Sequence, residues 1–176
     1  MTARSATDVE PIDETIDHVH GPGGGRLILE YGDYECPYSR AAYRQIQLVV
    51  QELGEGVRFA FRHFPLTSIH PHAFAASAAA EAAALQDGFW PMHDLLFHRQ
   101  KALEDQDLRR YAAEIGLDLA RFDSDRESAA VLRRIGRDVE SGVASGRVTG
   151  TPTLFIDGVV YRGGQQAAQL LEVLRA

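Results

Sequence analysis

The sequence contains very little cysteine: Cys36 is the only one in 176 residues. One cysteine cannot form an internal disulfide, so the fold must be held by packing, and this agrees with a reducing compartment. Long apolar runs are also missing. No stretch approaches the roughly 18 apolar residues of a membrane span, and the first residues lack the apolar run of a secretory signal. We therefore expect a cytoplasmic protein with no membrane partner.

Positive charge is scarce as well. Lysine and arginine number 18 against 25 acidic residues, which gives a formal net charge of -7. A negative net charge repels phosphate backbones and anionic lipids, so we expect no nucleic-acid partner. The 45% apolar and 24% charged residues are typical of a folded globular chain, and the length suits one domain.

The pattern around the cysteine predicts an arm, a strand and a helix. Residues 1–20 are acidic and polar without a period and lead into a glycine-rich stretch at 21–25, so we expect a flexible N-terminal arm. Residues 27–31 form a short apolar run typical of a strand buried on both faces. Cys36 and Pro37 follow, and apolar residues then recur at helical spacing until Gly54, which ends the helix.

The rest of the chain completes an α/β pattern. Residues 57–64 alternate like a second strand, and residues 70–146 are helical throughout. Asp157-Gly158 between two apolar runs predicts a β-hairpin, and a final amphipathic helix follows from about residue 165. We predict one domain over 21–176 with the order β-α-β, helices, β-β-α, in which the helical block at about 70–146 is an insertion.

Cys36 is the candidate nucleophile because of its place at a helix entrance. The unpaired N–H groups and the positive end of the helix dipole stabilise a thiolate there. Pro37 suits the first helical turn, where its missing N–H costs nothing. Ser39 lies on the same turn and can offer its hydroxyl to the sulfur. The alternative is that Cys36 is a small buried apolar residue; the catalytic interpretation predicts a solvent-accessible sulfur.

The segment around Cys36 resembles the active site of the bacterial DsbA-like family, in which a Cys-Pro-aromatic-Cys motif opens the first helix. Four further segments resemble that family in the same order, so the similarity covers about residues 18 to 164. With the cysteine segment, the matching stretches are Tyr31–Tyr38, Phe61–Leu66, His70–Ala73, Phe89–His93 and Val148–Thr153. The resemblance implies a thioredoxin fold and thiol–disulfide oxidoreductase activity on protein or small-molecule thiols and disulfides.

Further site residues are implied by the same resemblance. Thr151-Pro152 matches the cis-proline turn beside the active cysteine, which leaves the preceding backbone free to pair with a substrate. Together with Pro37 and Tyr38 this turn would bind substrate. Glu30, six residues before Cys36, matches the buried acid of the fold and would exchange protons with the sulfur.

The motif departs from the family at one position, because Ser39 stands where the second cysteine is expected. An internal disulfide is then impossible, and an external thiol must resolve the mixed disulfide. This implies a monothiol mechanism with no bound cofactor and with glutathione or an analogue as co-substrate. Ser39 is either natural or an engineered replacement; the sequence leaves both open.

Other functions stay open at this level. A kappa-type glutathione transferase shares the fold and would use Ser39 to activate a bound thiol, and a non-catalytic peptide-binding or chaperone module would use the cis-proline edge. We expect no metal site, because the histidines that lie near one another in the sequence lack the spacing of zinc ligands. These histidines are His63, His70, His72, His93 and His98. The oligomeric state is not readable from the sequence.

Overall fold

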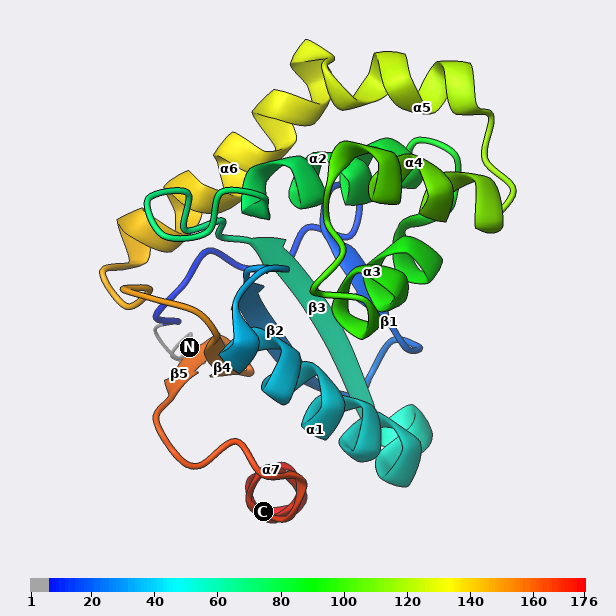
Figure 1. The fold of residues 1–176 in the computed structure, drawn as a ribbon. Helices are drawn as coiled ribbons and strands as arrows, with labels where there is room; N and C mark the ends of the chain where they lie inside the picture. The colour runs from blue at the N-terminus through cyan, green and yellow to red at the C-terminus, as the bar shows by residue number, and fades with distance from the viewer. Residues whose placement is uncertain (1–6) are drawn as a thin grey trace.

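The fold is built on one mixed five-stranded sheet (Figure 1). The structure is a computed structural model that describes residues 7–176. Its strands are β1 (His18–His20), β2 (Arg26–Gly32), β3 (Val57–His63), β4 (Thr153–Ile156) and β5 (Val159–Tyr161). They lie in the order β1-β3-β2-β4-β5, with β2 and β3 parallel and the other neighbours antiparallel. The predicted α/β order is confirmed, with β1 as an additional edge strand.

Two helices belong to the α/β core, and five form the insertion. The core helices are α1 (Pro37–Leu53), followed by the short 3-10 turn η1 (Gly54–Gly56), and α7 (Ala167–Arg175). The insertion contains α2 (Ala73–Ala84), α3 (Phe89–His98), α4 (Asp105–Glu114), α5 (Leu119–Arg126) and α6 (Ala129–Ser145). These bounds fit the predicted helical block, although no separate sequence signal marked α5.

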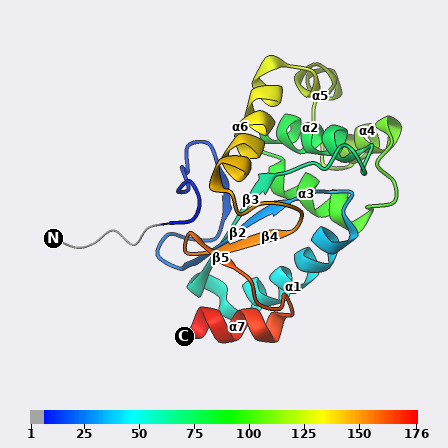
Figure 2. The same cartoon turned by 90° about the vertical axis from the view of Figure 1, so that its left-hand side faces the viewer.

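The main core lies on the face of the sheet that carries Ile28, Phe59 and Leu154. Apolar residues of α1 to α5 and of α7 complete it. The opposite face carries Leu29 and Phe155 and packs against a smaller apolar group from the N-terminal segment and the segment after α6. In Figure 2, α1 and α7 lie toward the bottom of the view and the helices of the insertion toward the top. β2 is therefore buried on both faces, as its apolar run predicts. β3 is buried on both faces as well, although its alternating pattern predicted one buried face.

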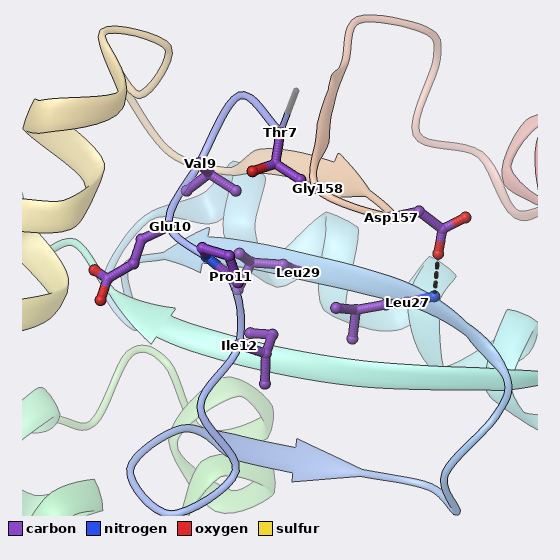
Figure 3. A pocket seen from close by; sticks show the side chains of 9 residues that line it. All are labelled: Thr7, Val9, Glu10, Pro11, Ile12, Leu27, Leu29, Asp157 and Gly158. Carbon is purple, nitrogen blue, oxygen red and sulfur yellow. Dashed lines mark hydrogen bonds between the residues drawn. The ribbon is translucent and has the colours of Figure 1, made fainter. Parts of the chain in front are cut away.

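The hairpin between β4 and β5 turns where the sequence predicts it. Asp157 has a φ angle of 50° and Gly158 one of 83°. Positive φ at both central residues is the type I′ geometry that Asp-Gly accepts at low cost. The Asp157 carboxylate also accepts the backbone N–H of Leu27 at 2.9 Å (Figure 3), so the turn is tied to the start of β2.

The N-terminal segment is not the flexible arm that the sequence predicted. Residues 1–6 lie outside the described residues, but residues 7–20 pack on the domain. Asp8 donates its backbone N–H to Gly158 O at 2.8 Å, and its side chain accepts the N–H of Val160 at 3.0 Å. Residues 9–12 then cross the back of the sheet, and β1 pairs with β3 (Figure 3). The polar composition gave no sign of this docking, because the few apolar residues of the segment, such as Val9 and Ile12, recur without a period.

A buried ion pair fixes the same segment. Asp17 and Arg62 have fully buried side chains and join through two hydrogen bonds of 2.9 and 2.8 Å. Arg62 also donates to the carbonyls of Glu10 and Pro11 and to the hydroxyl of Tyr31. The guanidinium thereby satisfies backbone groups that would otherwise be buried without partners.

A pocket of ≈ 250 Å³ remains between this segment and the sheet (Figure 3). It is lined by Thr7, Val9, Glu10, Pro11, Ile12, Leu27, Leu29, Asp157 and Gly158. None of these residues belongs to the cysteine turn or to the Thr151–Pro152 turn, so the pocket is separate from the candidate site described next. Within residues 7–176, every helix is too short or too polar to span a bilayer.

Candidate active site

Cys36 is the N-cap residue of α1, where the sequence places it. Its backbone is extended, and Pro37 occupies the first helical position. The helix forms because Ala42, Tyr43, Ile46 and Val49 repeat on one face and pack into the core, and it ends at Gly54 with a φ of 51°. The sulfur therefore lies at the positive end of a 17-residue helix.

The sulfur is covered, which corrects the prediction of a solvent-accessible thiol. Cys36 is only 3% exposed. Its thiol donates to the carbonyl of Thr151 at 3.3 Å, so the loop before β4 lies directly over it. The neighbouring Pro37 and Tyr38 are exposed, Tyr38 to 73%. The exposed surface beside the sulfur is therefore formed by these two side chains.

The Thr151–Pro152 peptide bond is cis, as the resemblance implies. Both residues are half-buried, and the carbonyl of Thr151 is the group that contacts the sulfur. The loop after α6 thus comes next to the start of α1, although 115 residues separate the two positions in the sequence. The structure brings Cys36 and Thr151 together as the resemblance implies.

Ser39 does not offer its hydroxyl to the sulfur. The residue is fully buried, and its Oγ accepts the backbone N–H of Asp33 at 3.2 Å. Among residues 7–176, the hydrogen-bond partner of the Cys36 sulfur is the carbonyl oxygen of Thr151 and not the Ser39 hydroxyl. The hydroxyl therefore stabilises the turn before the helix, and this burial gives no support to Ser39 as the activating group of a transferase.

Asp33 and Gln100 hold the turn, and the sequence analysis assigned a role to neither. Asp33 is fully buried, and its carboxylate accepts the backbone N–H groups of Glu35 and Leu66, at 2.8 and 2.9 Å, and contacts His70 Nδ1 at 2.8 Å. The Gln100 side chain donates to the carbonyls of Tyr34 and Cys36, both at 2.8 Å. No periodic signal could reveal Gln100, because it reaches the turn from the helical insertion.

A surface pocket of ≈ 400 Å³ adjoins this turn. It is lined by Glu35, Pro37, His72, Gln100, Lys101, Leu103 and Glu104. His72 contacts Glu35 at 2.9 Å and Glu104 at 3.1 Å, and the hydrogen bond with Glu35 raises the pKa of His72. The pocket therefore lies directly beside Pro37.

Glu30 is the buried acid that the resemblance implies. It lies on β2 opposite Phe61 and is fully buried, and neither carboxylate oxygen has a hydrogen-bond partner among the described residues. Burial alone raises its pKa from 4.5 to about 8. A Cβ at Gly32 would meet the Phe61 ring at 2.4 Å and Glu30 Oε1 at 2.8 Å, so glycine is needed for this packing. Glu30 is therefore protonated at neutral pH.

We expect Glu30→Gln to flatten the pH dependence of stability between pH 4.5 and 8. Because the folded-state pKa of about 8 exceeds the unfolded 4.5, the stability linked to Glu30 is complete below pH 4.5 and is lost as pH rises to 8. The change is on the order of 5 kcal/mol, since one pKa unit is about 1.4 kcal/mol. Urea unfolding at several pH values measures it, with the exposed Glu55→Gln as control. An unchanged slope in Glu30→Gln would contradict the raised pKa.

One group outside this turn has the donor set of a metal ion. His18, His63 and Glu81 bring three ligand atoms within 4.8 Å of one another. In the insertion, His93 Nδ1 contacts the Tyr34 hydroxyl at 2.9 Å, and burial lowers the pKa of His93 well below its usual value.

Comparison with families and solved structures places this geometry in a known group. A family model described as Thioredoxin matches residues 24–176. A thioredoxin-like oxidoreductase from Silicibacter pomeroyi DSS-3 superposes with a TM-score of 0.80, at 27% identity over 90% of both chains. Oxidised BdbD from Bacillus subtilis gives 0.80 at 17% identity over 97% of both chains. MdbA, a thiol-disulfide oxidoreductase from Corynebacterium diphtheriae, gives 0.72 at 19% identity, over 98% of this chain and 96% of that one. These likenesses confirm the predicted thioredoxin fold with its helical insertion.

Curated relatives by sequence are much longer proteins. The Na(+)/H(+) antiporter NhaA of Herminiimonas arsenicoxydans is 44% identical over 167 residues, which are 94% of this chain and 26% of that protein. NhaA 1 of Mycolicibacterium vanbaalenii is 42% identical over 171 residues, which are 96% of this chain and 28% of that protein. The chain thus spans about a quarter of the length of these relatives.

Proposed function

This chain belongs to the thioredoxin family, and we propose that it is a thiol–disulfide oxidoreductase that works through Cys36 alone. The observation that carries the proposal is the meeting of the Cys36 sulfur, at the N-terminus of α1, with the carbonyl that precedes cis-Pro152. The superposed proteins described as oxidoreductases support it. Ser39 in the position of the second thiol supports the monothiol form.

The proposed exchange has two steps. The Cys36 thiolate attacks one sulfur of a substrate disulfide, a new disulfide forms between Cys36 and that sulfur, and the second substrate sulfur leaves as a thiolate that takes up a proton. An external thiol, such as glutathione, then loses its proton and attacks the substrate sulfur of the mixed disulfide. A new disulfide forms between the external thiol and the substrate, and Cys36 leaves as the thiolate. The helix N-terminus stabilises the anionic sulfur in both steps.

The proposed roles of the neighbouring residues follow from their places. Pro37 and Tyr38 form the exposed contact surface, and Thr151 and Pro152 form the backbone edge beside the sulfur. Glu30, held as a neutral acid by burial, would give its proton to the leaving sulfur and, as the resulting carboxylate, would take a proton back from the thiol. The predicted cytoplasmic location stays a prediction.

We expect the native protein to form a one-to-one mixed disulfide with glutathione when it is treated with glutathione disulfide. No internal thiol can resolve the adduct, so it accumulates and is seen by intact-protein mass spectrometry. Cys36→Ser should form no adduct, and Ser39→Ala should keep it. As a control, alkylation of Cys36 in the urea-unfolded protein shows that its thiol has not been oxidised beforehand.

Other outcomes favour other functions. A sulfur that reacts in urea but not in the native protein would contradict the exchange. Peptide binding that is unchanged in Cys36→Ala would then favour the non-catalytic module. Turnover of a chlorodinitrobenzene-type electrophile that requires Ser39 but not Cys36 would favour the kappa-type transferase.

A further inference from the structure

A cluster of two histidines and one glutamate lies on the sheet away from Cys36. His18 is on the edge strand β1 and pairs with Phe61 of β3. His63 is two residues further along β3 and on the same face of the sheet as Phe61, so the two histidines are diagonal neighbours. Glu81, on α2, completes the group. Three separate elements therefore bring together side chains that share no sequence motif.

The three ligand atoms are tightly grouped. The Nε2 atoms of His18 and His63 each lie 2.7 Å from the same oxygen, Glu81 Oε1. The side chains are 16%, 0% and 6% exposed for His18, His63 and Glu81. The His18 ring stacks on Phe89 with a centroid separation of 3.6 Å, and this contact holds its orientation. The donor set is therefore largely preorganised.

The charge and the tautomers of the cluster suit a cation. An ionised Glu81 supplies the one negative charge of the donor set, and both imidazoles already direct their Nε2 atoms at its Oε1. His63 Nδ1 is buried without a partner among the described residues. Without a metal, His63 Nε2 donates to the Glu81 carboxylate. Because Nδ1 has no partner among these residues, it can take the ring proton, which leaves the Nε2 lone pair for a metal ion.

A pocket gives the cluster an entry path. It measures ≈ 300 Å³ and opens between β1, α2 and α6, and its lining includes His18, Glu81, Thr15 and Arg134. A metal ion held by the three ligands would meet this pocket on its remaining side. Water or a small anion can occupy that fourth position.

We propose that His18, His63 and Glu81 form a binding site for Zn²⁺ with one open coordination position. Two imidazole nitrogens and a carboxylate oxygen are a donor set that zinc uses when a fourth position is left to water. On binding, the ion replaces the hydrogen-bonding protons of the two Nε2 atoms, which either move to Nδ1 or are released to solvent. The site is independent of the thiol exchange proposed for Cys36.

The test is titration of the purified chain with Zn²⁺ by calorimetry and with Co²⁺ by absorption. The wild-type protein should bind one ion per chain and show the visible bands of Co²⁺ in low coordination. Affinity should fall at least about 100-fold in His18→Gln and in Glu81→Gln, since each loses a ligand. His20→Gln, an exposed histidine on the same strand, is the matched control and should bind like wild type. Because the His18 side chain is partly exposed, we expect His18→Gln to fold. Weaker metal binding in His18→Gln then reports the lost ligand and not a lost fold.

Cys36→Ser separates this site from adventitious binding at the thiol. Binding should persist in Cys36→Ser and should show no thiolate-to-cobalt charge-transfer band. Metal binding should also raise the melting temperature of wild type and of His20→Gln but not that of His18→Gln. Binding that disappears in Cys36→Ser, or that survives unchanged in His18→Gln and Glu81→Gln, overturns the metal site. Neither result bears on thiol exchange, which the glutathione adduct tests separately.

Discussion

The Ser39→Cys variant is expected to form an internal disulfide that the parent protein cannot form. Cys36 is the N-cap of α1 and position 39 is the third residue of the helix, so both side chains belong to its first turn. Residues three apart on a helix have Cβ atoms about 5–6 Å apart, and a small local adjustment brings them to disulfide distance. Oxidised variant should be lighter than its reduced form by two hydrogens in intact-protein mass spectrometry.

The same variant should gain dithiol activity. A second thiol on the same turn attacks the mixed disulfide intramolecularly, at an effective concentration far above that of a dilute external thiol. We expect the rate of insulin disulfide reduction with limiting external reductant to rise roughly tenfold or more. The parent should be slow in this assay and should retain the small-thiol adduct instead.

Two controls decide the origin of any gain. Ser39→Ala loses the hydrogen bond to the Asp33 N–H but adds no thiol, so it should stay monothiol. Ser39→Cys combined with Cys36→Ser should form no internal disulfide. If Ser39→Cys folds and its two thiols do not join under oxidation, positions 36 and 39 are not apposed, and the assignment of this turn as the active site is wrong.

Local signals explain why much of the site could be predicted from the sequence. Pro37 marks a helix start, and Asp157-Gly158 marks a hairpin through backbone preferences that neighbouring residues alone determine. The burial of Glu30 follows from its place within an apolar strand. The meeting of Cys36 with Thr151 is long-range, and only the resemblance to a known family implied it.

Contacts between distant polar residues could not be predicted in this way. The docking of residues 7–20 depends on Asp17 reaching Arg62, 45 positions away, and a polar segment shows no apolar period that would reveal it. The grouping of His18 with Glu81 likewise depends on how β1 pairs and where α2 crosses. The cover over Cys36 comes from a carbonyl, which has no sequence signature at all.

Asp17→Ala is expected to destabilise the protein strongly. The substitution leaves the fully buried Arg62 guanidinium without its carboxylate, and removal of one partner from a buried pair costs about 3–5 kcal/mol. Arg137 also loses its 3.1 Å hydrogen bond to Asp17. Urea unfolding at pH 7 measures the loss. Glu14→Ala is the matched control on the same segment, because Glu14 is 66% exposed in its pair with Arg58 and should change stability by less than about 1 kcal/mol.

The pH dependence of stability is a second test of the Asp17–Arg62 ion pair. Burial alone would raise the pKa of Asp17, but hydrogen bonds from Arg62 and from the Asp13 N–H lower it from 3.8 to about 2. Because the folded-state pKa is the lower one, stability from Asp17 is present above pH 3.8 and is lost as pH falls toward 2, by about 2 kcal/mol. Asp17→Ala should lack this component of acid unfolding, and Glu14→Ala should keep it. A loss in Asp17→Ala no larger than that in Glu14→Ala would show that residues 7–17 contribute little to the folded state and would restore the prediction of a free arm.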